Sequence, residues 1–106
     1  MPKYLLIASY TAEGARGVLK EGGSSRREQA EKAVASLGGS VESFYFGFGA
    51  DDAYLVIDVP DHATAAAVSL TVSASGAVRC RTVPLIMPEE LDEAARKTVD
   101  YRPPGA

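Results

Sequence analysis

The chain has 106 residues, 46% of them hydrophobic and 24% charged, proportions typical of one folded domain rather than of a disordered chain. A formal net charge of −3 argues against nucleic acid and against an anionic membrane as partners. Apolar runs fall short of the roughly 20 residues that span a bilayer, and no signal peptide is evident. The single cysteine, Cys80, cannot form an internal disulfide, so we expect a cytoplasmic protein.

The first part of the chain predicts one strand and two helices. Residues 3–10 are aliphatic and aromatic, which favours a strand. Residues 11–20 predict a short, marginal helix, because Gly14 and Gly17 weaken it. A better helix is expected to begin at Ser25, which can form a capping box with Glu28, and to end at residues 38–39, a glycine pair.

The rest of the chain predicts three strands and two more helices. Residues 41–47 and 53–59 read as strands of a hairpin, because a short Gly/Asp turn separates them. Asp61 can cap a helix over 63–74 that Gly76 ends, and residues 78–86 form the fourth strand. Pro88 begins a last helix. We therefore expect one domain over residues 1–100 and a proline-rich tail over 101–106.

This element order, β-α-β-β-α-β with an extra C-terminal helix, predicts an α+β fold with a four-stranded antiparallel, ferredoxin-like sheet. The strands are apolar or aromatic on both faces, although the helices can cover only one. The simplest cover for the second face is the same face of another copy, so we expect a homodimer or higher homo-oligomer. Large amphipathic rings suit such an interface: Tyr4, Tyr10, Tyr45 and Tyr54. The alternative is that the C-terminal helix folds across this face.

Several segments resemble the GYD-domain family. They are residues 42–49 (Glu-Ser-Phe-Tyr-Phe-Gly-Phe-Gly), residues 53–61, the Gly-Gly-x-x-Arg-Arg run at 22–27, and the tail at 101–105. In the naming motif Gly49 and Asp52 match, but Asp51 occupies the tyrosine position. The resemblance implies a ferredoxin-like domain of the dimeric α+β barrel type, a group that includes cofactor-free monooxygenases, degradative enzymes and ligand-sensing modules.

Two side chains are candidates for chemistry on their own. His62 follows a strand-ending proline and begins a helix, where the dipole disfavours its protonated form, so it is a candidate catalytic base. The alternative is an ordinary solvated residue of a first turn. Cys80 lies between Arg79 and Arg81, but neighbours in a strand point to opposite faces, which favours a small buried side chain over a reactive thiol.

The remaining candidates form a ligand-binding set. Arg79 and Arg81 share a strand face, and Asp58 lies in an apolar strand where a lone charge is costly. We expect an Asp58–arginine ion pair or, alternatively, an arginine that holds an anionic ligand in a cavity between sheet and helices. Hydroxyl groups expected beside that ligand belong to Tyr10, Tyr45 and Tyr54.

Three functions remain open from the sequence. We favour a homo-oligomeric domain that binds a small anionic or aromatic ligand. The alternatives are a cofactor-independent monooxygenase-like enzyme and a purely structural assembly unit. No metal-ligand spacing, phosphate loop, dinucleotide fingerprint or G-x-S-x-G motif occurs, so we expect no metal and no cofactor.

Overall fold

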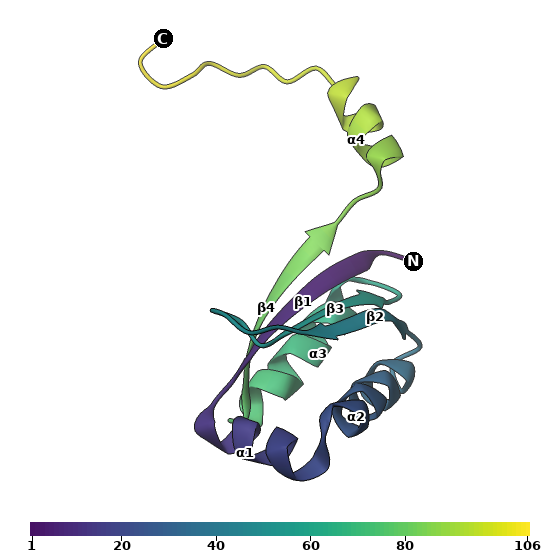
Figure 1. The fold of residues 1–106 in the computed structure, drawn as a ribbon. Coiled ribbons are helices and arrows are strands. Elements are labelled where there is room, and N and C mark those ends of the chain that lie inside the picture. The colour runs from purple at the N-terminus through teal and green to yellow at the C-terminus, as the bar shows by residue number, and fades with distance from the viewer.

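The computed structural model describes residues 1–106. The elements in chain order are β1 (Lys3–Tyr10), α1 (Ala12–Glu21), α2 (Gly23–Ala35), β2 (Ser40–Phe46), β3 (Ala53–Asp58), α3 (His62–Ala74), β4 (Val78–Leu85) and α4 (Pro88–Ala95). The strands form one antiparallel sheet in the order β2-β3-β1-β4, with α2 and α3 on one face and α1 at its end (Figure 1). This confirms the α+β, ferredoxin-like architecture.

The two ends of α3 and the β2–β3 hairpin agree with the capping and turn residues expected from the sequence. Asp61 Oδ1 accepts a hydrogen bond from the Thr64 amide at 2.8 Å, which caps α3 as expected. Gly76 has a φ of 77°, a conformation that only glycine adopts without strain, directly after the cap of α3. β2 and β3 pair antiparallel, and the turn before Ala53 connects them.

The expected start of α2 at Ser25 is wrong. The helix begins at Gly23, no side chain caps it, and the Ser25–Glu28 capping box does not form. Gly22 explains the shift, because its φ of 86° lets one residue end α1 and begin α2. The Gly22 amide donates to the Val18 carbonyl at 2.7 Å, and the Gly22 carbonyl accepts from the Arg26 amide at 3.3 Å. Ser25 therefore lies inside the first turn.

The buried residues lie on the helix-covered side of the sheet and in the elements that pack there. Only 12 of the 106 residues are buried. Side chains of β1 and β3 alternate, so that Tyr4 and Leu6 face α2 and α3 together with Ile57, which is fully buried. The expectation that Tyr4 and Tyr10 lie on the second face is therefore wrong, because both belong to the helix-side set of β1.

The second face of the sheet, called here the open face, has no helix over it. The strand registers place Val56, Leu5 and Val83 in one row across its middle, and none of the three is buried. Tyr45 and Tyr54 also lie on this face, with 70% and 38% of their surfaces exposed. The apolar centre of this face is uncovered within the single chain.

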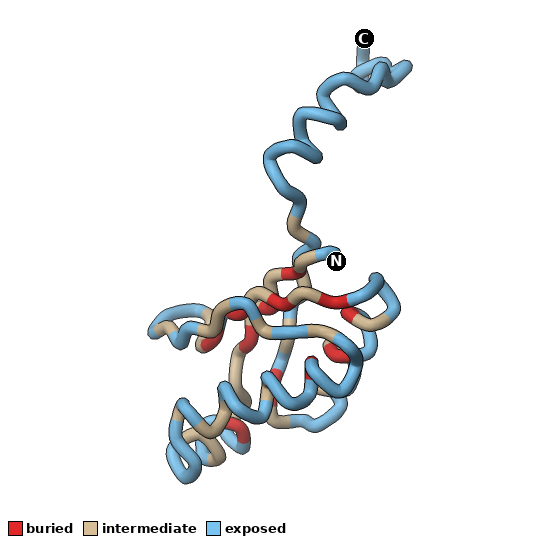
Figure 2. Tube along the Cα trace, turned by 90° about the vertical axis from the view of Figure 1, so that its right-hand side faces the viewer, coloured by how far each residue is buried: buried red, intermediate tan, exposed pale blue.

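The C-terminal helix does not supply that cover. α4 projects beyond the end of β4, away from the sheet (Figure 1). Every residue from Ile86 to Ala106 is exposed, as the pale blue end of the trace in Figure 2 shows. The alternative in which this helix folds across the second face is therefore wrong.

Candidate ligand-binding site

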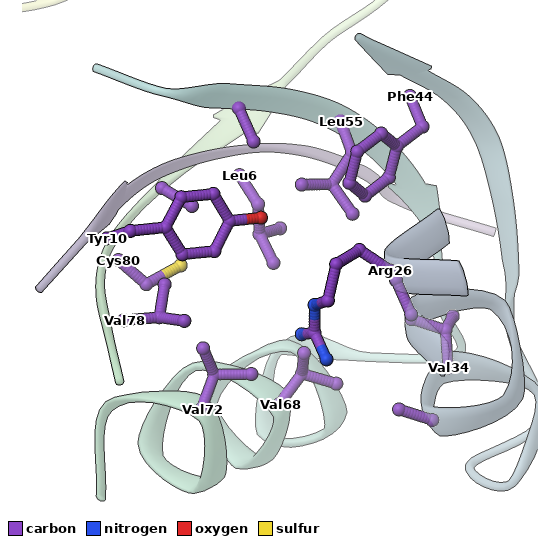
Figure 3. Close-up of a pocket in the computed structure, with 14 residues that line it drawn as sticks. Leu6, Tyr10, Arg26, Val34, Phe44, Leu55, Val68, Val72, Val78 and Cys80 are labelled. Carbon is purple, nitrogen blue, oxygen red and sulfur yellow. The ribbon is translucent and has the colours of Figure 1, made fainter. Parts of the chain in front are cut away.

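An apolar cavity of about 70 Å³ lies between the sheet and the helices α2 and α3 (Figure 3). Arg26, from the first turn of α2, is the only charged residue among the 14 that line it. The hydrophobic lining comes from β1, β2, β3, β4, α2 and α3: Leu6, Ala8, Tyr10, Ala30, Ala33, Val34, Phe44, Ala53, Leu55, Val68, Val72, Val78 and Cys80. A single cation in such a lining is well placed to orient a small ligand with an apolar body.

Arg26 and Tyr10 also line a second space, an outer hollow of about 310 Å³ beside α1. The two side chains therefore stand where the inner cavity meets the hollow, and Figure 3 shows both reaching into the space between sheet and helices. The inner cavity alone is far below the 300–1,000 Å³ typical of ligand pockets. The outer hollow is at the lower end of that range, and its lining also includes the carboxylates of Glu13 and Glu21.

The environment of Tyr10 keeps its hydroxyl group protonated. Burial raises the pKa of the Tyr10 phenol above its ordinary value of 10.0, and this outweighs the nearby Arg26 guanidinium, which favours the phenolate. At neutral pH the mouth of the cavity therefore presents a phenolic O–H and a guanidinium, both of which donate hydrogen bonds. That pair complements a carboxylate or another small anion.

The ligand-binding set expected from the sequence does not include Arg26. The signal was present, because Arg26 precedes Ala30 by four positions and Val34 by eight, and thus shares their helix face. Tyr10 is the one member of the expected ligand-binding set that reaches the cavity. Cys80 also lines the cavity, partly exposed, with Arg79 and Arg81 on the opposite face of β4.

The expectation that an arginine of the fourth strand lies in this cavity is therefore wrong. Arg79 and Arg81 lie on the open face, where they line a shallow hollow of about 390 Å³ with Ser9 and Asp51. Arg81 Nη2 lies 3.0 Å from Asp51 Oδ2, and Ser9 Oγ donates to Asp51 Oδ1 at 2.9 Å. Arg79 forms no ion pair within the chain. We call these four residues the arginine end of the open face.

The opposite end of the same face carries Lys3, Glu42 and Asp58, called here the lysine end. Lys3 Nζ lies 2.7 Å from Glu42 Oε2 and 2.9 Å from Asp58 Oδ2. Asp58 thus pairs with a lysine and not with an arginine as expected, since Lys3 is its direct cross-strand neighbour. Its other oxygen, Oδ1, is buried without a hydrogen-bond partner. The Lys3 ammonium holds the pKa of Asp58 below its ordinary value.

We expect the Lys3–Asp58 pair to make folding stability fall in acid. A carboxyl group whose pKa is lowered by folding stabilises the protein above its unfolded value of 3.8, and that contribution is lost as the pH falls through the lowered pKa. Asp58→Asn should therefore reduce stability at pH 7 and flatten its decline below about pH 4. Urea unfolding at a series of pH values checks this. Glu31→Gln serves as control, because this carboxylate is exposed on α2 and forms no ion pair. Equal profiles for both variants would contradict the assignment.

His62 lies away from the cavity. Its Nδ1 atom forms a hydrogen bond with the Tyr4 hydroxyl, and the two rings meet edge to face with centroids 5.8 Å apart. His62 itself is exposed at the start of α3, whereas Tyr4 is buried. His62 thus supplies the hydrogen-bond partner that the hydroxyl group of the buried Tyr4 needs. It does not line the cavity, where a catalytic base would meet a ligand.

The sequence model described as "GYD domain" matches residues 4–95, nearly the whole of the folded region. The chain belongs to the GYD-domain family. Neither a curated protein nor a solved structure is significantly similar to it. No helix of this GYD domain is long and apolar enough to cross a membrane. No three His, Cys, Asp or Glu side chains gather closely enough to hold a metal ion.

Residues 49–52, which resemble the naming motif of the family, lie at one end of the sheet. Asp52 accepts a hydrogen bond from the Tyr10 amide at 2.8 Å, and its own amide donates to the Ala8 carbonyl at 2.8 Å. Asp51 forms the contacts of the arginine end. In this GYD domain the segment thus ties the β2–β3 turn to β1.

Proposed function

We propose that this GYD domain binds a small anion with an apolar body in the cavity between sheet and helices, and that it works as a homo-oligomer. The observation that carries the binding proposal is the isolated guanidinium of Arg26 in an otherwise hydrophobic lining, with the Tyr10 hydroxyl beside it. A carboxylate or phenolate at Arg26 would place its hydrocarbon part against Leu6, Phe44 and Leu55.

The enzyme alternative has less support. A cofactor-independent oxygenation needs a base beside the bound substrate. His62 is hydrogen-bonded to Tyr4 and does not line the cavity. No other histidine occurs in the sequence. Binding without chemistry is therefore the better reading of this arrangement. The assembly-unit alternative requires only the open face and predicts no ligand at all.

Binding of benzoate, compared with the neutral benzyl alcohol, tests the ligand proposal. Arg26→Ala should weaken benzoate binding by roughly tenfold or more, because a hydrogen bond to a charged group contributes about 1.5–3 kcal/mol. It should leave the weaker binding of benzyl alcohol nearly unchanged. Titration calorimetry and ligand-observed NMR measure both.

Arg27→Ala is the matched control, because this neighbouring arginine is exposed and does not line the cavity. Tyr10→Phe should produce a smaller loss than Arg26→Ala, since it removes one neutral donor. Equal losses in the Arg26 and Arg27 variants would exclude this cavity as the site. If neither benzoate nor a short alkanoate such as hexanoate binds the native protein, the assembly-unit reading is preferred.

The homo-oligomer part of the proposal rests on the open face. Its central row, Val56–Leu5–Val83, is apolar and has no cover within the chain. Its two ends carry complementary side-chain charge. At the lysine end two carboxylates contact one ammonium, and at the arginine end Asp51 pairs with Arg81 while Arg79 lines the same hollow without an ion-pair partner. A two-fold axis that reverses the strand direction lays each end over its opposite in the second copy.

A further inference from the structure

The C-terminal arm, residues 86–101, is a segment whose apolar side chains have no cover. Met87, Leu91, Val99 and Tyr101 are 51–76% exposed, and no residue of α4 is buried. Helices shorter than about 12–15 residues are marginal in water on their own. α4 has only eight residues, so its helical state calls for a packing partner.

The side chains of α4 divide into two kinds. Met87, Leu91, Ala94 and Ala95 recur at positions i, i+4, i+7 and i+8, which places them on one side of the helix. The remaining positions after Pro88 are all acidic: Glu89, Glu90, Asp92 and Glu93. An apolar stripe between acidic flanks fits a surface that is apolar and carries unpaired positive charge.

The arginine end of the open face is a surface of this kind. The arm is far from the arginine end of its own chain, so the matching surface would belong to another copy. The arm leaves the sheet after Leu85, which pairs with Lys3, and therefore starts at the lysine end. The arginine end lies at the other end of β1 and β4, where Ser9 pairs with Arg79. The arm also points away from its own sheet (Figure 1).

Two-fold symmetry removes this separation. If open faces stack about an axis that runs across the strands, the lysine end of one copy lies over the arginine end of the other. The root of each arm then emerges beside the second copy's Arg79, which has no ion-pair partner in its own chain. Ile7 and Arg79 both line the hollow of about 390 Å³ at that end. Ile7 could contact the apolar stripe of α4, and Arg79 could pair with its acidic flanks.

We propose that the C-terminal arm packs on the arginine end of a second copy of this chain. The apolar stripe of α4 then lies against the sheet, and its acidic flanks lie against Arg79. This inference rests on the proposed homo-oligomer. It adds that the two copies exchange arms, so that α4 becomes ordered only in the assembly.

Amide hydrogen exchange of the full chain at several concentrations tests the arm, with sedimentation velocity on the same samples to follow dimer formation. Protection of the α4 amides should rise about tenfold or more across the concentration range in which the dimer forms. Protection of the α3 amides should change much less, because α3 is held by the core of its own chain.

Two variants with controls locate the contact. Leu91→Glu should abolish the protection of α4 but leave a dimer, whereas Leu70→Glu, at a leucine exposed on α3, should have no such effect. Arg79→Glu should lower α4 protection, and Arg16→Glu on α1 should not.

The failures of the two proposals are distinguishable. A dimer whose α4 amides exchange freely at every concentration would overturn the arm exchange and leave the homo-oligomer standing. A chain that stays monomeric would overturn the homo-oligomer, and the arm exchange with it. Protection of α4 that is independent of concentration would show that the arm packs on its own chain, which also overturns the inference.

Discussion

Replacing Val56 with aspartate is expected to turn the assembled protein into monomers. Val56 occupies the central row of the open face, between Ser43 on β2 and Leu5 on β1. In the proposed dimer this row lies beneath the second copy, and a carboxylate there would be buried without a partner. An uncompensated buried charge costs about 3–5 kcal/mol, so the dimer dissociation constant should rise more than about a hundredfold.

Sedimentation velocity from nanomolar to high micromolar concentration measures this change. Leu70→Asp is the control, because it introduces the same charge at an exposed position of α3 on the helix side. Circular dichroism should show that both variants keep the fold, since Val56 is not part of the buried core. A Val56→Asp protein that dimerises like the native chain would refute the open face as the interface.

Ile57→Ala is expected to cause the largest loss of folding stability, about 2–5 kcal/mol. Ile57 is fully buried in the middle of β3, among the residues that join the sheet to α2 and α3. Removing its outer carbons leaves a void in a core with few buried residues, and neighbouring side chains can fill it only in part. The change should lower the urea midpoint with little change in the slope of the transition.

Ile57→Val is the matched variant, because it removes a single methylene and should cost only about 0.5–1.5 kcal/mol. All proteins need the same concentration in this comparison, since association stabilises the folded state by mass action. If the alanine and valine variants lose the same stability, Ile57 does not sit in a tightly packed environment.

The two faces of the sheet carry separate tasks in the proposed picture. The helix side forms the core and the small cavity with Arg26 at its mouth. The open side carries assembly, with an apolar centre and charged ends. The benzoate experiment addresses the first side and the Val56 experiment addresses the second, so either proposal can fail while the other stands.

Most elements of the fold could be predicted from the sequence because their signals are local. Strand residues alternate, Asp61 caps α3, and Gly76 follows its end, each within a few positions. The start of α2 could not be predicted from the same rules. Ser25 and Glu28 match a capping pattern, but α2 begins earlier because Gly22 is both the C-cap of α1 and the N-cap of α2.

Local patterns in the sequence are enough to predict the order of the elements, the single sheet and the excess of apolar strand surface over the helices that could cover it. The choice of the face that the helices cover depends on tertiary packing, which places Tyr4 and the half-buried Tyr10 on the helix side and Arg79 and Arg81 on the open face. The reason is physical: both strand faces are apolar, so alternation separates two sets of residues without saying which set is covered. Arg26 reaches the cavity only because α2 packs beside β2 with that side toward the sheet, a contact between segments that no local pattern records.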